Sequence, residues 1–227
     1  KKERKKERKK ERKKERKKER KKERTKERNK KKIKKEKNNK EKKNSDNISI
    51  HSFKKRLAWH CHFIQKLEDQ PQIEFKSMHP AYEGIRDDFT NEFYFKSWKE
   101  GKTGFPIVDA CMRNLIYTGW LPFRMRAMLV SFASYNLLID WKKSGVYLAK
   151  LFTDFEPGIH YSQMQMQSGV TGINAIRIYN PIKQSYDQDP EGTFIRKWVD
   201  ELKYIHTAYI HEPWSMNCLL YTSPSPR

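Results

Sequence analysis

Cysteine is scarce in this chain, and long apolar runs are missing from it. Only three cysteines, Cys61, Cys111 and Cys218, occur among 227 residues, and this odd number has no paired spacing. We therefore expect a reducing intracellular compartment, the cytoplasm or the nucleus, rather than secretion. No apolar run approaches the roughly 20 residues of a membrane-spanning helix. The sequence thus predicts no membrane partner.

Acidic residues are too few to balance the basic ones at the start of the chain. Residues 1–47 contain 29 Lys and Arg against 10 Asp and Glu, a net charge of +19, whereas the remainder has 21 against 18, a net charge of +3. Residues 1–24 are six copies of Lys-Lys-Glu-Arg with no apolar stripe to bury. We predict a disordered or single-helix charged arm over residues 1–47. It binds nucleic acid, serves as a nuclear import signal, or is a repeat expansion or assembly artefact without function.

The composition becomes globular at Ile48. Residues 48–216 are enough for one domain with a hydrophobic core. Residues 217–227 share none of its character and are interpreted as an unrelated tail. The chain begins with neither Met nor an apolar leader, so we expect a fragment of a longer protein.

The most informative stretch is residues 98–126, WKEGKTGFPIVDACMRNLIYTGWLPFRMR. Pro106 stands near the first position of a predicted helix, and Val108 and Leu115 fall on one helical face. Gly119 is placed to end that helix. On the residues alone this is a helix–turn–helix corner with a packed tryptophan.

Apolar periodicity predicts two more helices, one over about 52–68 and one over 126–139. In the first of them His60, Cys61 and His62 occupy successive positions. Successive residues point to different sides of a helix, so these three cannot share a metal ion. No metal site is predicted.

The string at 98–126 closely resembles the signature of the flavin-binding domain in the photolyase/cryptochrome family, W-x-x-G-x-T-G-x-P-x-V-D-A-x-M-R-x-L-x-x-T-G-W. The matching residues, without a gap, are Trp98, Gly101, Thr103, Gly104, Pro106, Val108, Asp109, Ala110, Met112, Arg113, Leu115, Thr118, Gly119 and Trp120. A second block, 174–202, retains Arg177, Asn180, Pro181, Gln184, Asp189, Pro190, Gly192, Ile195, Arg196, Trp198, Val199, Glu201 and Leu202. The resemblance covers about residues 53–214. It implies an all-α fold, the helical FAD-binding domain of photolyase/cryptochrome type.

The resemblance also implies a cofactor site. Arg126 and Asp154 correspond to a buried arginine–carboxylate pair beside the FAD ring, a pairing that avoids the cost of burying either charge alone. Glu156 replaces an aspartate near one edge of the ring. His160 replaces the asparagine that faces its nitrogen N5. The family's phosphate-cradling loop and its antenna chromophore domain have no counterpart in this sequence.

The helix over about 52–68 carries further family positions. Trp59 matches the tryptophan on which repair enzymes stack a flipped pyrimidine dimer. Arg56 and His60 stand where the family has a flavin-proximal acid and an arginine. Both are assigned to the cofactor site, and both substitutions put dimer recognition in doubt without touching flavin binding.

DNA contacts and an electron relay are implied in the same way. Trp120 joins Trp59 as an aromatic wall of the lesion pocket, while Arg124 and Gln184 are DNA-contacting positions. Trp141 matches the middle tryptophan of the family's relay.

The other two relay positions depart from the family. Met164 stands where the flavin-proximal tryptophan belongs and Asp88 where the terminal one does, with Tyr94 as a substitute. The three-tryptophan route therefore cannot operate as it does in the family.

Three functions stay open. The first is FAD-dependent, blue-light-driven repair of damaged DNA by a lyase, in which electron transfer from reduced flavin acts on a flipped-out pyrimidine lesion. The second is a cryptochrome-like photoreceptor, which the substitutions at Arg56, His60, His160 and Met164 favour. The third is a non-catalytic fragment of the fold. Repair is preferred because Trp59, the Gln184 position and the basic arm suit a DNA partner.

Overall fold

The computed structural model describes residues 48–173 and 176–217. The chain divides into two compact units, residues 1–59 and residues 60–227. In the first unit, residues 48–59 are helical and exposed, and in the second unit residues 60–69 are helical. The helix predicted over about 52–68 is thereby confirmed. The charged arm of residues 1–47 lies outside the described residues, as does the tail from 218 onward, and the domain boundary before residue 48 stays a prediction.

The described part of the second unit consists of helices and loops without a strand, which confirms the all-α class. Its α-helices are α2 (Glu92–Lys99), α3 (Pro106–Thr118), α4 (Phe123–Ser131), α5 (Trp141–Ala149), α6 (Pro157–Ser168), α7 (Pro181–Gln188) and α8 (Thr193–Trp198). Short 3-10 turns are η1 (Pro71–Glu74), η2 (Pro80–Tyr82), η3 (Asp87–Phe89), η5 (Asp200–Leu202) and η6 (Pro213–Ser215), and η4 (Phe132–Asn136) is a π-helix.

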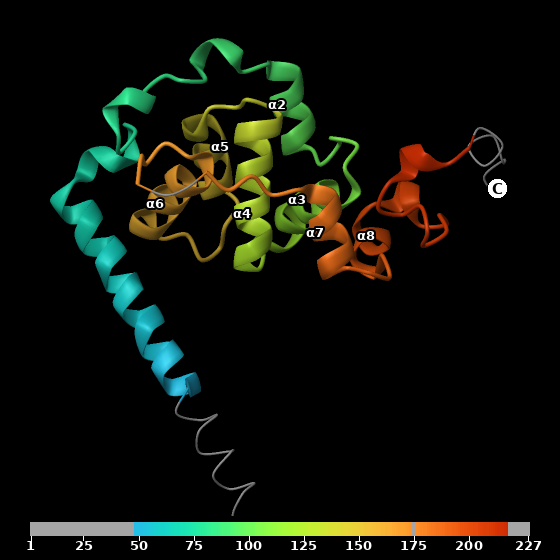
Figure 1. The fold of residues 1–227 in the computed structure, drawn as a ribbon, viewed down its shortest axis with the longest axis horizontal. Helices are drawn as coiled ribbons and strands as arrows, with labels where there is room; N and C mark the ends of the chain where they lie inside the picture. Colours follow the sequence, from blue (N-terminus) through green and yellow to red (C-terminus); the bar gives the residue numbers. More distant parts are fainter. Residues whose placement is uncertain (1–47, 174–175, 218–227) are drawn as a thin grey trace, which may run out of the picture. The chain divides into compact units, whose positions relative to one another are not determined.

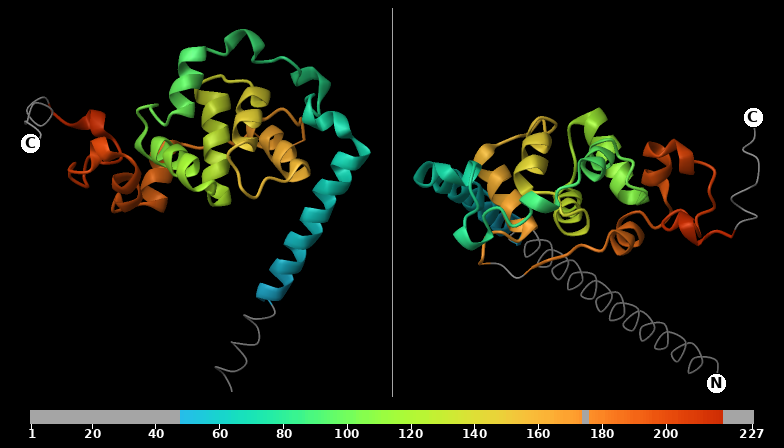
Figure 2. Two further views of the ribbon diagram at one scale, coloured as in Figure 1. Left: turned by 180° about the vertical axis from the view of Figure 1, so that it is seen from behind. Right: turned by 90° about the horizontal axis from the view of Figure 1, so that it is seen from above.

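Helices α3 and α4 form the centre of the second unit (Figure 1). Helices α7 and α8 pack on α3, while α6 packs on α4 and in turn on α5, as the two further views also show (Figure 2). The largest fully buried side chains come from all these layers: Trp98, Ile107, Met112, Leu115, Leu121, Met128, Leu129, Phe132, Ile139, Trp141, Leu148 and Ile195.

Helix α3 has the ends that its sequence predicts. Pro106 takes the first helical position, where its missing N–H has no cost. Gly119 ends the helix with φ of 71°, in the left-handed region that favours glycine. A Cβ on Gly119 would lie 2.4 Å from Cγ2 of Thr153, so the close approach of the 151–153 segment also requires glycine.

The helix predicted over 126–139 differs from the one that forms. It begins at Phe123, directly after Pro122, and α4 ends at Ser131, where the π-helix η4 takes over. The wider turn buries Phe132, Ala133 and Ser134 in succession. A pattern built on 3.6 residues per turn cannot anticipate that change of period.

Hydrogen bonds of signature residues brace the α3 side of the unit. The buried Asp109 carboxylate accepts from the backbone N–H of Thr103 (2.7 Å), from the Thr103 hydroxyl (2.7 Å) and from the N–H of Gly104 (2.9 Å). Arg113 forms a two-point ion pair with Glu201, at 2.7 and 3.0 Å. These contacts fix the turn before α3 and tie α3 to the segment after α8.

Candidate functional site

A cavity of about 180 Å³ lies between α4, the loop at 152–156 and α6. Its lining combines aromatic and aliphatic side chains with several polar groups. The lining residues are Phe123, Arg126, Ala127, Val130, Phe152, Asp154, Phe155, Glu156, Ile159, His160, Gln163, Met164 and Gln167. Four of the predicted cofactor residues, Arg126, Asp154, Glu156 and His160, are therefore brought together.

Arg126 and Asp154 form a two-point ion pair on the cavity wall. The guanidinium donates to both carboxylate oxygens at 3.0 and 2.9 Å, and its Nε donates to the carbonyl of Leu121 at 2.7 Å. The same guanidinium lies over the ring of Phe152, 4.3 Å from its centre. The expected burial of the pair is wrong, because the Asp154 side chain is 50% exposed. Water therefore screens part of the attraction between the two charges.

His160 has its tautomer set by a neighbour across the cavity wall. Its Nε2 lies 2.9 Å from the carbonyl oxygen of Gly145 in α5, and because a carbonyl only accepts, Nε2 carries the hydrogen. Burial lowers the pKa of His160, with a smaller contribution from the positive charge of Arg126. The imidazole is therefore neutral near pH 7, with an unprotonated Nδ1.

Glu156 has a structural task at the edge of the cavity. It is the N-cap of α6, and its carboxylate oxygens accept from the backbone N–H groups of Gly158 (3.1 Å) and Ile159 (2.7 Å). A carboxylate is favourable there because it satisfies free N–H groups and complements the helix dipole. Its predicted place at the ring edge stays a prediction.

Sequence reasoning missed several cavity residues, among them Phe152, Phe155, Ile159 and Gln163. Helical spacing could have predicted those on α4 and α6, because they lie on the same helix faces as the predicted residues Arg126 and His160. The cavity face of α4 is 123, 126, 127 and 130, and that of α6 is 159, 160, 163, 164 and 167. Gln163 adds a polar group of note, because its Oε1 is buried without a hydrogen-bond partner among the described residues.

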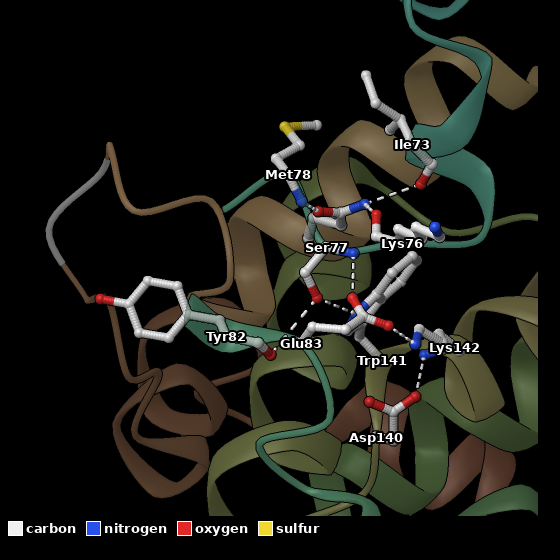
Figure 3. A network of polar contacts seen from close by, with 10 residues as sticks. Ile73, Lys76, Ser77, Met78, Tyr82, Glu83, Asp140, Trp141 and Lys142 are labelled. Atoms are coloured by element: carbon white, nitrogen blue, oxygen red, sulfur yellow. Dashed lines mark hydrogen bonds and ion pairs between the residues drawn. The ribbon is translucent and has the colours of Figure 1, made fainter. Parts of the chain in front are cut away.

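Trp141 is buried at the start of α5 and hydrogen-bonded to a side chain of an earlier loop (Figure 3). Its indole Nε1 donates to Ser77 Oγ at 3.3 Å. The N–H of Ser77 donates to Glu83 at 2.6 Å, and Glu83 also pairs with Lys142, which holds the pKa of the Glu83 carboxyl below its usual range. The role of Trp141 as an electron relay stays a prediction.

The predicted DNA contacts do not all reach the surface. Trp120 and Arg124 are exposed and lie outside the cavity lining. Gln184, predicted as a DNA contact, is instead buried in α7, and its Oε1 has no partner among the described residues. Gln184 is buried because α7 packs on α3 with this position turned into the protein, and its contact with DNA stays a prediction.

The predicted site residues of the helix at 48–69 are divided between the two units. Arg56 and Trp59 belong to the first unit, where their side chains are exposed. His60, in the second unit, is also exposed and is not among the residues that line the cavity, and its predicted cofactor contact stays a prediction. The helix meets α6 at Phe63, whose carbonyl oxygen lies 2.7 Å from where a Cβ on Gly158 would stand.

The residues that the structure describes include neither a metal-binding cluster nor a membrane-spanning helix. Within 48–173 and 176–217, no group of three or more His, Cys, Asp or Glu side chains is placed to hold a metal ion. In the same ranges no helix combines the length and apolarity needed to cross a bilayer.

Comparison with known sequences places this geometry in context. Residues 53–222 match the family described as the FAD binding domain of DNA photolyase. A deoxyribodipyrimidine photo-lyase of Vibrio cholerae is 42% identical over 171 residues, 73% of this chain and 36% of the relative. One of Alkalihalophilus pseudofirmus is 36% identical over 181 residues, 76% of this chain and 36% of the relative. The chain thus spans about a third of the length of the curated relatives it matches.

Solved structures give the same result. An archaeal photolyase from Sulfolobus tokodaii, with two FAD molecules, is similar with a TM-score of 0.68 and 33% identity, over 76% of this chain and 40% of that one. A Synechocystis cryptochrome is similar with a TM-score of 0.66 and 28% identity, over 74% and 35% of the two chains.

Proposed function

Because the chain belongs to the family of FAD-binding domains of DNA photolyase, we propose that its cavity takes the ring end of FAD. We propose further that the whole protein is a lyase for light-driven repair of pyrimidine lesions in DNA. The observation that carries this is the cavity itself, which joins aromatic walls to the Arg126–Asp154 pair and His160. The curated relatives named deoxyribodipyrimidine photo-lyase support the activity.

The cavity fits a planar ring system with polar edges. Its volume of about 180 Å³ is below the roughly 300–1,000 Å³ of pockets that enclose whole drug-sized ligands, so it suits part of a dinucleotide. Phe152, Phe155 and Ile159 offer apolar contact, and the partnerless Oε1 of Gln163 is ready to accept from a ring N–H. The ring system of FAD is planar, and its polar edge includes a ring N–H.

The chain's own residues would bind and orient the cofactor. Arg126 presents a fixed positive charge, held by Asp154 and by the Leu121 carbonyl. Neutral His160 offers Nδ1 as a proton acceptor, since Nε2 is committed to Gly145. When bound, FAD supplies the light-driven one-electron chemistry. On the DNA side, Trp59 in the first unit and Trp120 in the second are each proposed as an aromatic side chain on which a flipped-out base stacks, and Arg124 would contact phosphate.

A flavin titration of the purified chain tests the cofactor half of the proposal. Arg126 and Arg124 form a matched pair, two residues apart on α4, of which only Arg126 lines the cavity. We expect quenching of FAD fluorescence on binding, lost or weakened at least tenfold in Arg126→Ala and unchanged in Arg124→Ala. Equal behaviour of the two variants would sink the assignment of this cavity.

Binding to ultraviolet-damaged and undamaged DNA over a salt series tests the repair half. Base–aromatic stacking contributes on the order of 1–3 kcal/mol, so Trp59→Ala should weaken lesion binding by roughly ten- to a hundredfold. Removal of residues 1–47 should weaken binding to damaged and to undamaged DNA by the same factor, because phosphate contacts carry no information about a lesion.

A cryptochrome-like photoreceptor is the second candidate. The burial of Gln184 favours it, since a buried side chain is less accessible to a DNA strand, and so does the similarity to the Synechocystis cryptochrome. A flavin-loaded protein without preference for damaged DNA at any salt concentration would favour this function over repair.

A further inference from the structure

Two adjoining open hollows of about 500 and 560 Å³ lie between α2 and α5. They share Glu92, Lys99 and Tyr147, and together we call them the lysine groove. The lysines that line it are Lys96 and Lys99 from α2 and Lys142, Lys143 and Lys150 from α5 and its end. Glu92 and Glu100 are the acidic residues in the lining, so the lining has three more positive than negative charges.

Part of this positive charge is not neutralised by the protein. Lys143 pairs with Glu92 at 2.6 Å, and Lys96 approaches Glu100 only to 3.9 Å. Within 48–173 and 176–217, Lys99 and Lys150 have no carboxylate at ion-pair distance. These two lysines leave positive charge for an outside anion.

Lys99 is held in the middle of the groove by aromatic rings. Its ammonium lies 4.8 Å from the ring centre of Phe95 and 5.6 Å from that of Tyr147. Tyr147 is itself fixed, because its hydroxyl donates to the Lys99 carbonyl at 3.2 Å. The two rings hold the Lys99 ammonium in position, and the Lys99 side chain lies over the two rings.

The lysine groove and the cavity are on opposite sides of α5. Gly145 faces α6, where a Cβ would lie 3.6 Å from the Met164 side chain and 4.0 Å from His160 Nε2. Lys143 and Tyr147, two positions before and two positions after Gly145, each lie about 160° from it around the helix, at 100° per residue. Among the residues that the structure describes, none lines both the groove and the cavity, so a ligand in the groove does not compete for the cavity.

We propose that the lysine groove binds the phosphate backbone of a nucleic-acid strand, as a contact separate from any that presents a lesion to the cavity. Lys99, at the end of α2, and Lys150, directly after α5, present from both walls of the groove the positive charge that no carboxylate of the described residues neutralises. Lysines are point charges without a base-reading fork, suited to phosphates rather than base edges. This inference does not depend on flavin binding.

The chemistry of the groove favours nucleic acid over an acidic protein. Protein interfaces are built around apolar and aromatic anchors and are depleted in lysine. Here the aromatic rings lie beneath Lys99, so they offer neither an anchor for a protein nor a platform for stacked bases. Binding should therefore be strongly salt-dependent and indifferent to base sequence.

The test is a fluorescence anisotropy titration of the full chain with a short oligothymidine over a salt series. The groove variant carries Lys96→Gln, Lys99→Gln and Lys150→Gln. A control of equal charge carries Lys183→Gln, Lys197→Gln and Lys203→Gln, three exposed lysines outside the groove. Both retain residues 1–47, whose contribution cancels. Three lost single-strand phosphate contacts should lower the salt slope by about 2 in the groove variant alone.

Lysine acetylation of the unmutated chain gives a second measurement that needs no variant. We expect the oligothymidine to protect Lys99 and Lys150 and to leave Lys183 and Lys203 reactive. Equal slopes for the two triple variants would overturn the proposal. So would protection of the groove by polyglutamate but not by the oligothymidine, which would indicate an acidic protein instead.

Discussion

The α3 side of the second unit and the cavity wall use their family positions differently. On the α3 side the retained signature residues work inside the protein: Asp109 holds the preceding turn, and Asp189 accepts from the N–H groups of Phe194 and Ile195 at 3.1 and 2.9 Å. On the cavity wall, the resemblance matches Arg126 and Asp154 to the family pattern, whereas Glu156, His160 and Met164 stand where it predicts other residues. The retained residues that identify the family therefore mostly maintain the fold, whereas several of the residues that face the cavity differ from the family pattern.

The strongest test of this contrast is Asp109→Ala. It would leave three hydrogen-bond donors of a partly buried turn without their acceptor, and each unsatisfied buried donor costs about 1–3 kcal/mol. We expect the free energy of unfolding in urea to fall by about 3 kcal/mol or more. The exposed Asp187→Ala is the control, with a change within about 0.5 kcal/mol. A loss below 1 kcal/mol for Asp109→Ala would show that the retained residues are not the scaffold.

Gln165→Leu tests whether α6 is only a cavity wall. The fully buried Gln165 amide donates to the carbonyls of Ile73 (2.8 Å) and Lys76 (2.9 Å) and accepts from the N–H of Met78 (2.7 Å). Its loss leaves buried backbone groups unpaired, so we expect about 2–3 kcal/mol of destabilisation in the same urea experiment. The variant should still titrate with FAD at low temperature, because Gln165 lies outside the cavity lining. Unchanged stability would place the scaffold on the α3 side alone.

Arg126→Ala should have the opposite balance, with a small effect on stability and a large one on flavin binding. Asp154 is half exposed, so its unpaired carboxylate can be solvated by water. We expect about 1–2 kcal/mol of destabilisation, less than the 3–5 kcal/mol typical of a broken buried pair. Arg126→Lys keeps the charge but loses the two-point geometry, so its stability and its flavin affinity should lie between those of the unmutated chain and those of Arg126→Ala. A stability loss above 3 kcal/mol would assign Arg126 to the scaffold.

The smallest expected effect is on pH dependence at His160. Because burial lowers its pKa, the unfolded chain binds more protons than the folded one between the folded pKa and about 6.5. Stability should therefore fall as the pH drops through this window. His160→Gln should remove this contribution, which is at most about 1.4 kcal/mol per pH unit. If the dependence of stability on pH were the same in His160→Gln as in the unmutated chain, His160 would be protonated as readily in the folded protein as in the unfolded one.

The sequence determined the local features of this protein. The ends of α3 follow from Pro106 and Gly119, whose backbone preferences act within a few residues. The all-α class follows from apolar periodicity and from the family signature. The pairing of Arg126 with Asp154 was also predictable, although only through the resemblance, since 28 residues separate the two.

Only the tertiary structure decided which faces are open. It turned Gln184 inward, left His60 outside the cavity, exposed half of Asp154, and brought α2 and α5 together into the lysine groove. Helical periodicity gives the direction of a side chain relative to its own helix. Whether that direction meets water, a cavity or another helix depends on segments distant in the chain, and their packing is a property of the whole core.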